Sequence, residues 1–208
     1  MNTPMKLLIV EDHRLVRQGL VRIIELQPDM AVVAEASTGE EAVALHAQHR
    51  PDVTLMDLQL PGISGIDAIR AIRERDPGAR IVVLTMYYGD EDVYRAFRAG
   101  AMAYVLKDAV LDDLVRVLHD VHQGKRVVPA EIAALLDARA SQPSLTSREH
   151  QVLELLVTGK RNKEIAEVLG MSRDTARAHV KSIFQKFNVH DRTAAMAEAL
   201  RRGIVHLK

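Results

Sequence analysis

The chain of 208 residues is long enough for two domains, and 48% apolar and 27% charged residues are ordinary proportions for a folded protein. It has no cysteine, which excludes disulfides and thiolate metal sites, and no apolar run approaches the roughly 20 residues of a membrane span. The first residues lead straight into a short apolar run and lack the plan of a signal peptide, so we expect a cytoplasmic protein without a membrane partner.

The formal net charge is zero because two parts of the chain have net charges of opposite sign. Residues 144–208 hold 12 Lys and Arg against 7 Asp and Glu, which leaves 16 against 21 for residues 1–143. This division predicts two domains with different partners, and it makes the basic C-terminal part a candidate for nucleic-acid binding. A chance scatter of surface charge would give the same count, so the motifs have to decide.

The first 122 residues alternate short apolar runs with amphipathic segments. The predicted strands cover residues 6–10, 31–36, 53–56, 81–84 and 103–106. Each strand is followed by a predicted helix, and these helices cover residues 14–26, 39–49, 65–75, 90–99 and 111–123. Five βα units in series predict an α/β fold with a parallel sheet covered by helices on both faces. The strands are almost wholly apolar, as burial on both sides requires.

Four of the five predicted strands end in polar or charged residues. These are Glu11 and Asp12 after the first strand, Asp57 after the third, Thr85 after the fourth and Lys107 after the fifth. The carboxyl ends of parallel strands share one edge, where open α/β sheets bind ligands. Taken singly, Asp57 could be a turn residue and Lys107 a surface charge, but together these residues predict a functional site.

Three carboxylates at one edge repel one another unless a cation joins them. Hard oxygen ligands suit Mg²⁺, which binds through one or two carboxylates and keeps several waters. A carboxylate beside the metal can act as a nucleophile and form an aspartyl phosphate, whose oxygens need positive charge and hydrogen-bond donors. We assign Asp57 as the nucleophile because its strand lies between those of the acid pair and Thr85. Glu11 and Asp12 are then metal ligands, and Thr85 and Lys107 serve the phosphoryl group.

Residues 5–123 resemble the receiver domain of a two-component response regulator. The matching motifs are VEDH at 10–13, LMDLQLPGISG at 55–65, VLTM at 83–86 and GAMAYVLKD at 100–108. The resemblance implies a CheY-like (βα)5 doubly wound parallel sheet of strand order 2-1-3-4-5. It also implies that Asp57 is the phosphoacceptor and that a sensor histidine kinase is the phosphodonor.

The same resemblance assigns further roles at the sheet edge. It implies Mg²⁺ bound by Glu11 or Asp12, by Asp57 and by the backbone carbonyl of Gln59. It implies a switch formed by Thr85 and Tyr104, which reorient when phosphate arrives. Many receivers have a cis proline after the lysine, whereas Asp108 follows Lys107 here. A cis bond before a non-proline residue costs about 2.5–4 kcal/mol, so the sequence leaves the isomer of this bond open.

Residues 124–143 are interpreted as a linker with a possible short helix near 130–138 and a flexible joint at 141–144. Residues 144–208 are predicted to be all helix. Thr146 and Glu149 form a capping box for a helix that stops near Gly159, and a short helix follows at 163–169. Ser172 is placed to cap a third helix that runs to about 187, and Asp191 a fourth that runs to about 202.

Two helices joined by a tight turn in a basic segment predict a helix-turn-helix. On the third helix, an apolar stripe occurs at helical spacing and comprises Ala176, Val180, Ile183, Phe184 and Phe187. Arg177, Lys181 and Gln185 form a polar stripe on another face, which is the division a recognition helix needs to reach base edges. Phosphate contacts are available to Lys160, Arg161, Lys163 and Arg173. An ordinary four-helix domain with solvated lysines is the alternative.

Residues 145–195 resemble the LuxR-type helix-turn-helix, and both signatures in this order resemble the NarL/FixJ family of response regulators. The resemblance implies that Arg177, Ala178 and Lys181 read base edges in double-stranded DNA, with Lys163, Arg173 and Thr175 also at the interface. The last helix corresponds to the family's dimerising helix, where Ala194, Ala195 and Ala199 would permit close packing in a homodimer on DNA.

The sequence therefore predicts a bacterial transcription factor that is controlled by phosphorylation of Asp57 and is not an enzyme beyond its own phosphoryl transfer and dephosphorylation. Phosphorylation would change dimerisation or expose the DNA-binding part. One alternative is a phosphotransfer enzyme with an aspartyl phosphate and a helical protein-interaction module. A third interpretation keeps DNA binding but makes the receiver a phosphate-independent dimerisation module, which the full set of acids, Thr85 and Lys107 argues against.

Overall fold

A computed structural model describes residues 3–86, 89–108, 111–140 and 142–205. The contacts between residues divide the chain into two compact units. The first unit comprises the residues up to 87 and residues 93–134, and the second comprises residues 88–92 and the residues from 135 onward. We call them the sheet unit and the helical unit. The division at 134–135 falls inside a helix, α6 (Ala130–Ala140), which the sequence predicted as a shorter element of the linker. The boundaries 5–123, 124–143 and 144–208 remain a prediction.

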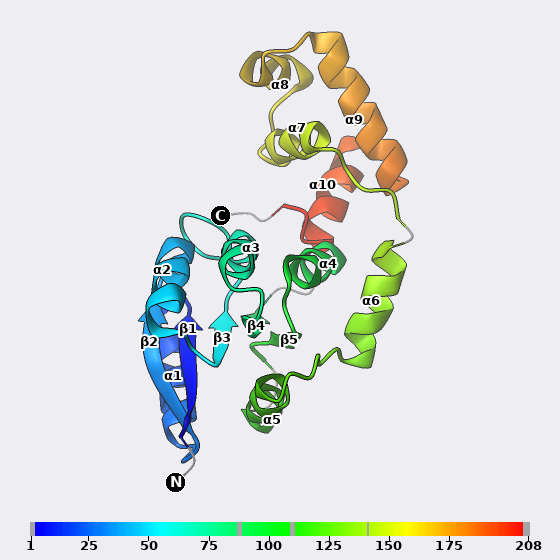
Figure 1. The fold of residues 1–208 in the computed structure, drawn as a ribbon. Coiled ribbons are helices and arrows are strands. Elements are labelled where there is room, and N and C mark those ends of the chain that lie inside the picture. Colours follow the sequence, from blue (N-terminus) through cyan, green and yellow to red (C-terminus); the bar gives the residue numbers. More distant parts are fainter. Residues whose placement is uncertain (1–2, 87–88, 109–110, 141, 206–208) are drawn as a thin grey trace. The chain divides into compact units, whose positions relative to one another are not determined.

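The sheet unit contains five parallel strands in the order β2-β1-β3-β4-β5 (Figure 1). The strands are β1 (Met5–Val10), β2 (Met30–Ala36), β3 (Val53–Met56), β4 (Ile81–Thr85) and β5 (Ala103–Leu106). The predicted CheY-like topology is confirmed. Three strand boundaries differ by one residue from the prediction, since β1 begins at Met5, β2 begins at Met30 and β4 ends at Thr85. The backbone carbonyl of Thr85 accepts a hydrogen bond from the Lys107 N–H.

Helices cover both faces of this sheet. They are α1 (Arg14–Glu25), α2 (Gly39–His49), α3 (Gly65–Arg75), α4 (Asp90–Ala99) and α5 (Leu111–His122). One apolar core joins Leu20 and Ile24 of α1 and Leu118 of α5 to strand residues such as Leu7 and Leu55. Because neighbouring side chains of a strand point to opposite faces, Leu8 and Met56 point to the other face, where α2 packs on α3 (Figure 1). Strands β1, β3, β4 and β5 are largely buried, as predicted, whereas the edge strand β2 is half-buried over most of its length.

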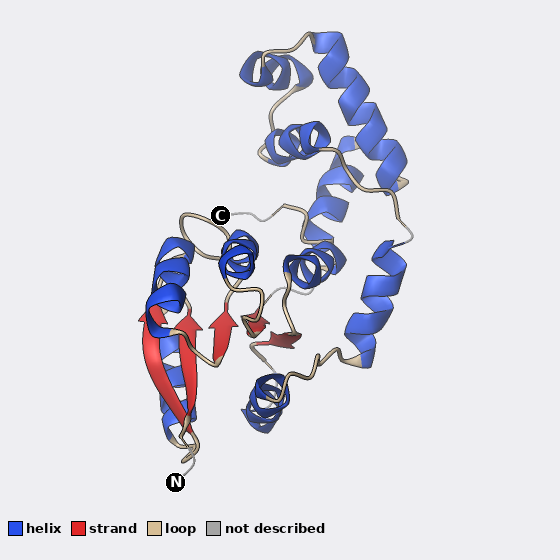
Figure 2. Ribbon diagram, in the orientation of Figure 1, coloured by secondary structure: helices blue, strands red, loops and turns tan. Residues whose placement is uncertain are grey.

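The described part of the helical unit contains helices and no strand (Figure 2). After the end of α6 come α7 (Ser147–Val157), α8 (Asn162–Leu169), α9 (Arg173–Phe187) and α10 (Arg192–Arg201). Their apolar faces meet in one core that includes Leu153, Leu156, Ile165, Ile183 and Phe187. The four predicted helices are confirmed to within one or two residues at their ends, as expected where helix termini fray.

Local sequence signals explain where these helices begin and end. The predicted capping box is present, because the Thr146 hydroxyl accepts the N–H of Glu149 while the Glu149 carboxylate accepts the N–H of Thr146. Ser172 and Asp191 cap α9 and α10 through their side-chain oxygens, as predicted. Gly170, at φ 61°, ends α8 in the left-handed conformation that glycine adopts without strain.

Candidate functional site

The parallel register brings the predicted site residues to one edge of the sheet. Val10 pairs with Met56, so the residues that follow them lie side by side, and the Asp57 N–H donates to the carbonyl of Val10 at 3.0 Å. The side chains are well shielded from solvent: Glu11 is 1%, Asp57 4% and Thr85 0% exposed. Burying several ionised carboxylates costs folding free energy unless cations or hydrogen-bond donors compensate their charge.

Lys107 supplies part of that compensation. Its ammonium lies between two carboxylates, 2.6 Å from Glu11 Oε2 and 2.7 Å from Asp57 Oδ2. Burial lowers the pKa of Lys107, but the hydrogen bonds and charges of Asp57 and Glu11 outweigh burial, and the pKa is raised above its usual value. Lys107 is therefore a fixed positive charge beside Asp57 at neutral pH.

Backbone donors hold the Asp57 carboxylate in place. Its Oδ1 accepts the N–H of Leu58 at 2.7 Å and, more weakly, the N–H of Gln59 at 3.4 Å. The loop after β3 then turns back, so that a Cβ added to Gly65 would lie 2.0 Å from the Asp57 carbonyl oxygen. The glycine at the end of LMDLQLPGISG is thus required by close backbone approach, at the position where α3 begins.

The donor set at this edge fits a divalent cation of the Mg²⁺ type. Glu11, Asp12 and His13 place ligand atoms within 4.8 Å of one another. Among the described residues, Lys107 is the one lysine or arginine that pairs with the side chains of Glu11 and Asp57, while Asp12 lies beside His13. Three carboxylates with one fixed cation leave an excess of negative charge at this edge of the sheet. Hard oxygen donors with excess negative charge are what Mg²⁺ prefers. Gln59, the predicted carbonyl ligand, lies half-buried in the loop after Asp57.

His13 belongs to this cluster, although sequence reasoning gave it no role. Its Nδ1 lies 2.8 Å from Asp12 Oδ1, and its backbone N–H donates to Glu11 Oε1 at 3.2 Å. The imidazole is 74% exposed and so lies at the mouth of the site. Its position directly after the acid pair in VEDH was the only signal available.

The predicted switch residues are both inside the sheet unit. Thr85 is fully buried, and Tyr104 of β5 is 2% exposed with its ring 6.5 Å from that of Phe97 on α4. No cis peptide bond occurs among the described residues, so the Lys107–Asp108 bond is trans. The question that the sequence left open at Asp108 is thereby answered.

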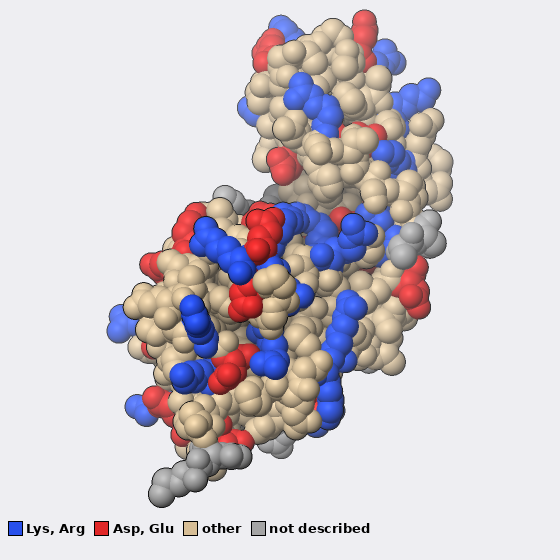
Figure 3. Space-filling model, in the orientation of Figure 1, with Lys and Arg blue, Asp and Glu red and all other residues tan. Residues whose placement is uncertain are grey.

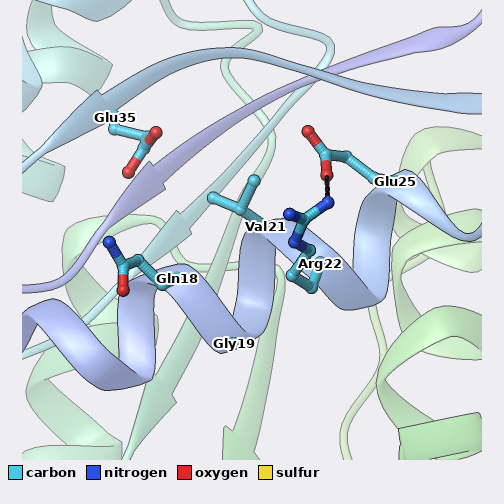
Figure 4. Close-up of a pocket in the computed structure, with 6 residues that line it drawn as sticks. All are labelled: Gln18, Gly19, Val21, Arg22, Glu25 and Glu35. Carbon is cyan, nitrogen blue, oxygen red and sulfur yellow. Dashed lines mark hydrogen bonds and ion pairs between the residues drawn. The ribbon is translucent and has the colours of Figure 1, made fainter.

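A separate hollow of about 590 Å³ lies along α1 and β2 (Figure 4). Gln18, Gly19 and Val21 of α1 line it together with Glu35 of β2, and Arg22 pairs with Glu25 at 3.3 Å. None of its lining residues was predicted as a site residue. Its open shape and paired charges distinguish it from the buried cluster around Asp57.

In the helical unit, α9 has the two faces that its sequence predicted. Ala176, Val180, Ile183 and Phe187 are buried in the core, while Phe184 is half-buried at its margin. The residues predicted to meet DNA are all exposed: Lys163, Arg173, Thr175, Arg177, Ala178 and Lys181. Basic and acidic side chains are interspersed on the face drawn in Figure 3. The candidate DNA-binding surface is defined by these exposed residues of α8 and α9.

The three alanines predicted for dimerisation differ in their exposure to solvent. Ala195 and Ala199 are 0% exposed and belong to the core of their own unit, whereas Ala194 is half-buried. The two buried alanines let α10 pack closely on α7 and α9, which accounts for them without a second copy of the chain. The outer face of α10 carries Ala197 and Leu200 instead.

Comparison with known proteins agrees with both units. Residues 7–119 match the family described as "Response regulator receiver domain", and residues 143–199 match "Bacterial regulatory proteins, luxR family". The chain belongs to the LuxR-type response regulators of two-component systems. This response regulator is therefore built as a receiver followed by a DNA-binding domain, as the sequence predicted. None of its described helices is both long and apolar enough to cross a membrane.

Similar proteins span nearly the whole of this response regulator. The "Nitrate/nitrite response regulator protein homolog" of Haemophilus influenzae is 37% identical over 199 residues, 94% of this chain and 96% of that protein. "Transcriptional regulatory protein LiaR" of Bacillus subtilis is 35% identical over 209 residues, 97% and 99% of the two chains. The structure of RcsB from Salmonella enterica serovar Typhimurium, bound to a promoter in the presence of a phosphomimetic, is 27% identical with a TM-score of 0.70, covering 97% and 100%.

Proposed function

We propose that this response regulator accepts a phosphoryl group on Asp57 from a sensor histidine kinase and thereby changes its binding to double-stranded DNA. The observation that carries the proposal is the Lys107 ammonium, which lies within 2.7 Å of both buried carboxylates, Glu11 and Asp57. A buried nucleophilic carboxylate beside a fixed cation suits the transfer of an anionic phosphoryl group.

The transfer step follows from the chemistry of a carboxylate. An Asp57 oxygen attacks phosphorus, the bond from phosphorus to the donor nitrogen or oxygen breaks, and the leaving group takes the electron pair and then a proton. Lys107 and the Thr85 hydroxyl would hold the phosphoryl oxygens. Glu11 or Asp12, Asp57 and the Gln59 carbonyl would hold Mg²⁺, which when bound neutralises charge on the transferring group. Thr85 and Tyr104 would relay the new charge as a two-state element.

The chain would perform only this transfer and its own dephosphorylation, and it would not turn over a separate substrate. Asp57→Ala should abolish labelling by radioactive acetyl phosphate in the presence of Mg²⁺. Asp67→Ala is a matched control, because Asp67 is an acid of the same unit that lies on the exposed side of α3. Phosphate uptake by the Asp57→Ala variant at an unchanged rate would exclude Asp57 as the acceptor. Multiple turnover of a phosphate ester would instead favour a phosphotransfer enzyme.

For the helical unit, we propose that α9 enters the major groove. Arg177, Ala178 and Lys181 would meet base edges, and Lys163, Arg173 and Thr175 would meet the backbone. Support comes from the exposure of these side chains on the face opposite the core. A homodimer on DNA would use the outer face of α10 with Ala194, and a cytoplasmic location remains a prediction.

Selection of bound DNA from random duplexes gives a target on which α9 can be tested. Lys181→Ala should weaken binding to that target by about tenfold, since a good base contact contributes about 1–3 kcal/mol. Lys125→Ala, a lysine of the sheet unit that pairs with Asp120, should leave the affinity unchanged. Equal affinities of the Lys181→Ala variant and the unchanged chain would disprove the assignment of α9.

A further inference from the structure

A second cluster of charged side chains lies at the opposite edge of the sheet unit from Asp57. A cavity that is open to solvent, of about 410 Å³, is lined by three segments that come before β4, before β5 and after α5. The lining side chains that matter here are Arg73, Arg80 and Arg126, together with Pro77, Phe97 and Met102. Arg80 directly precedes β4 and Met102 directly precedes β5, so the cavity lies at the amino ends of these strands. The phosphoacceptor site lies at their carboxyl ends.

The lining of this cavity is strongly one-sided in charge. It contains three arginines, and none of the described residues that line it is acidic. In the part of the chain that the structure describes, no carboxylate lies within 4.0 Å of these guanidinium groups. The nearby acid Asp76 accepts from the Gly78 N–H at 3.0 Å and lies 3.3 Å from His46 Nε2, and the charge of Arg73 also acts on its carboxylate. Arg80 and Arg126 have no carboxylate within 4.0 Å among the described residues, so the cavity keeps an excess of positive charge.

Two of the arginines are held in place by contacts to neutral groups. Arg73 donates to the backbone carbonyl of Ala79 at 2.9 Å, and the guanidinium of Arg126 lies 4.7 Å from the centre of the Phe97 ring. At Gly100, φ is +113° and an added Cβ would approach the Arg73 side chain to 2.8 Å. Because Gly100 has no side chain, there is room for the Arg73 side chain beside it. The positions of Arg73 and Arg126 are therefore preorganised before any ligand arrives.

We propose that this arginine cavity binds a small anion with two adjacent phosphates, such as a nucleoside diphosphate. Guanidinium groups bind phosphate oxygens in pairs, and Arg is preferred over Lys where that planar geometry is needed. A diphosphate carries about the negative charge that three arginines compensate, whereas a monophosphate leaves one of them unpaired. A volume of about 410 Å³ lies in the range of ligand sites, and Pro77 and Met102 offer apolar surface for the nucleoside.

The site is independent of the phosphoacceptor chemistry proposed for Asp57. The ligand would contact the segments that lead into β4 and β5. Thr85 is the last residue of β4, and Tyr104 is the second residue of β5. Binding would stabilise this part of the sheet unit and raise the melting temperature with ligand concentration.

Isothermal titration calorimetry of the full chain, without Mg²⁺ and at constant ionic strength, tests the proposal with two probes, inorganic pyrophosphate and ADP. We expect saturable binding of both at one site per chain. Tighter binding of ADP would show that the nucleoside contributes, and equal affinities would show that the two phosphates suffice. Absence of heat from both probes at millimolar concentration would overturn the proposal.

Variants locate the site. Arg80→Ala and Arg126→Ala should each weaken binding about tenfold or more, because each removes a charge-assisted contact. Arg98→Ala is the matched control, since Arg98 is an exposed arginine of α4 outside the cavity, and its affinity should not change. Melting curves without ligand establish that each variant is folded. Binding that survives both cavity substitutions, or that is lost in the Asp57→Asn variant, would place the anion elsewhere and disprove the site.

Discussion

Glu149 lies in the first turn of α7, where its side chain takes part in the capping box. It is also the centre of a buried ionic network. It is 4% exposed, its Oε2 lies 2.6 Å from Lys186 Nζ, and its Oε1 accepts the Ser182 hydroxyl at 2.7 Å. The Thr146 N–H also donates to Oε2, at 2.6 Å. Lys186 and Ser182 belong to α9, so one carboxylate joins the start of α7 to the helix proposed to read DNA. We predict that Glu149→Gln strongly destabilises the helical unit.

The pKa of Glu149 gives the size of this effect. Burial alone raises the pKa, but hydrogen bonds from Lys186, Thr146 and Ser182 outweigh it and lower the pKa from 4.5 to about 2. At about 1.36 kcal/mol per pH unit, the ionised carboxylate contributes about 3 kcal/mol to folding. Because the folded pKa is the lower one, this contribution is complete above the unfolded value of 4.5 and is lost as pH falls through about 2.

Hydrogen exchange of the full chain at pH 7 measures the effect where it arises. Amides of α7 and α9 should lose about 3 kcal/mol of protection in the Glu149→Gln variant, which is about a hundredfold faster exchange. Amides of the sheet unit should be unaffected. In urea unfolding at pH 3, the difference between the two chains should shrink to roughly 1–2 kcal/mol, because the carboxylate of the unfolded chain, with its pKa of 4.5, is then protonated while that of the folded chain stays largely ionised.

Glu164→Gln supplies the matched control. Glu164 has the same place in the first turn of α8 and accepts the N–H of Arg161 at 2.7 Å, but its side chain is 47% exposed and lacks a buried lysine partner. We expect it to cost less than about 1 kcal/mol. If Glu149→Gln cost no more than Glu164→Gln, or if its cost did not fall with pH, the network would not stabilise the unit as reasoned.

Two further predictions concern packing. Gly65→Ala should slow labelling of Asp57 by acetyl phosphate at least tenfold, because the new Cβ would collide with the Asp57 carbonyl and displace the loop; Gly19→Ala, with open space around it, should label normally. Labelling of the Gly65→Ala variant at full rate would contradict this reading of the loop. Leu153→Ala, at a position that is 0% exposed, should destabilise the helical unit by about 2–5 kcal/mol in the same exchange experiment. A loss below 1 kcal/mol would mean that the core closes around the missing side chain.

Much of the fold could be predicted from the sequence because its signals are local. Apolar runs, helical spacing and capping residues such as Ser172 act over a few residues, and they placed the helices and strands to within a few positions. The polar strand ends also predicted which residues meet, since parallel strands necessarily bring Asp57 and Lys107 to one edge.

Other features depend on residues that are distant in the sequence, and only the tertiary structure decided them. The pairing of Glu149 with Lys186 spans 37 positions, so the sequence showed the cap but not the buried ion pair. The family resemblance places Ala195 and Ala199 at a dimer surface, but alanine spacing alone does not tell which side of a helix faces the core, and in the structure both lie in the core of their own unit.

The arginine cavity is the clearest case of this limit. Arg73, Arg80 and Arg126 lie on three segments without a shared motif, and each resembles a solvated surface charge when considered alone. Local patterns specify the elements of a fold because they depend on backbone geometry and solvent contact within one element. The charges around a cavity depend on how elements pack, and that is fixed only when the chain has folded.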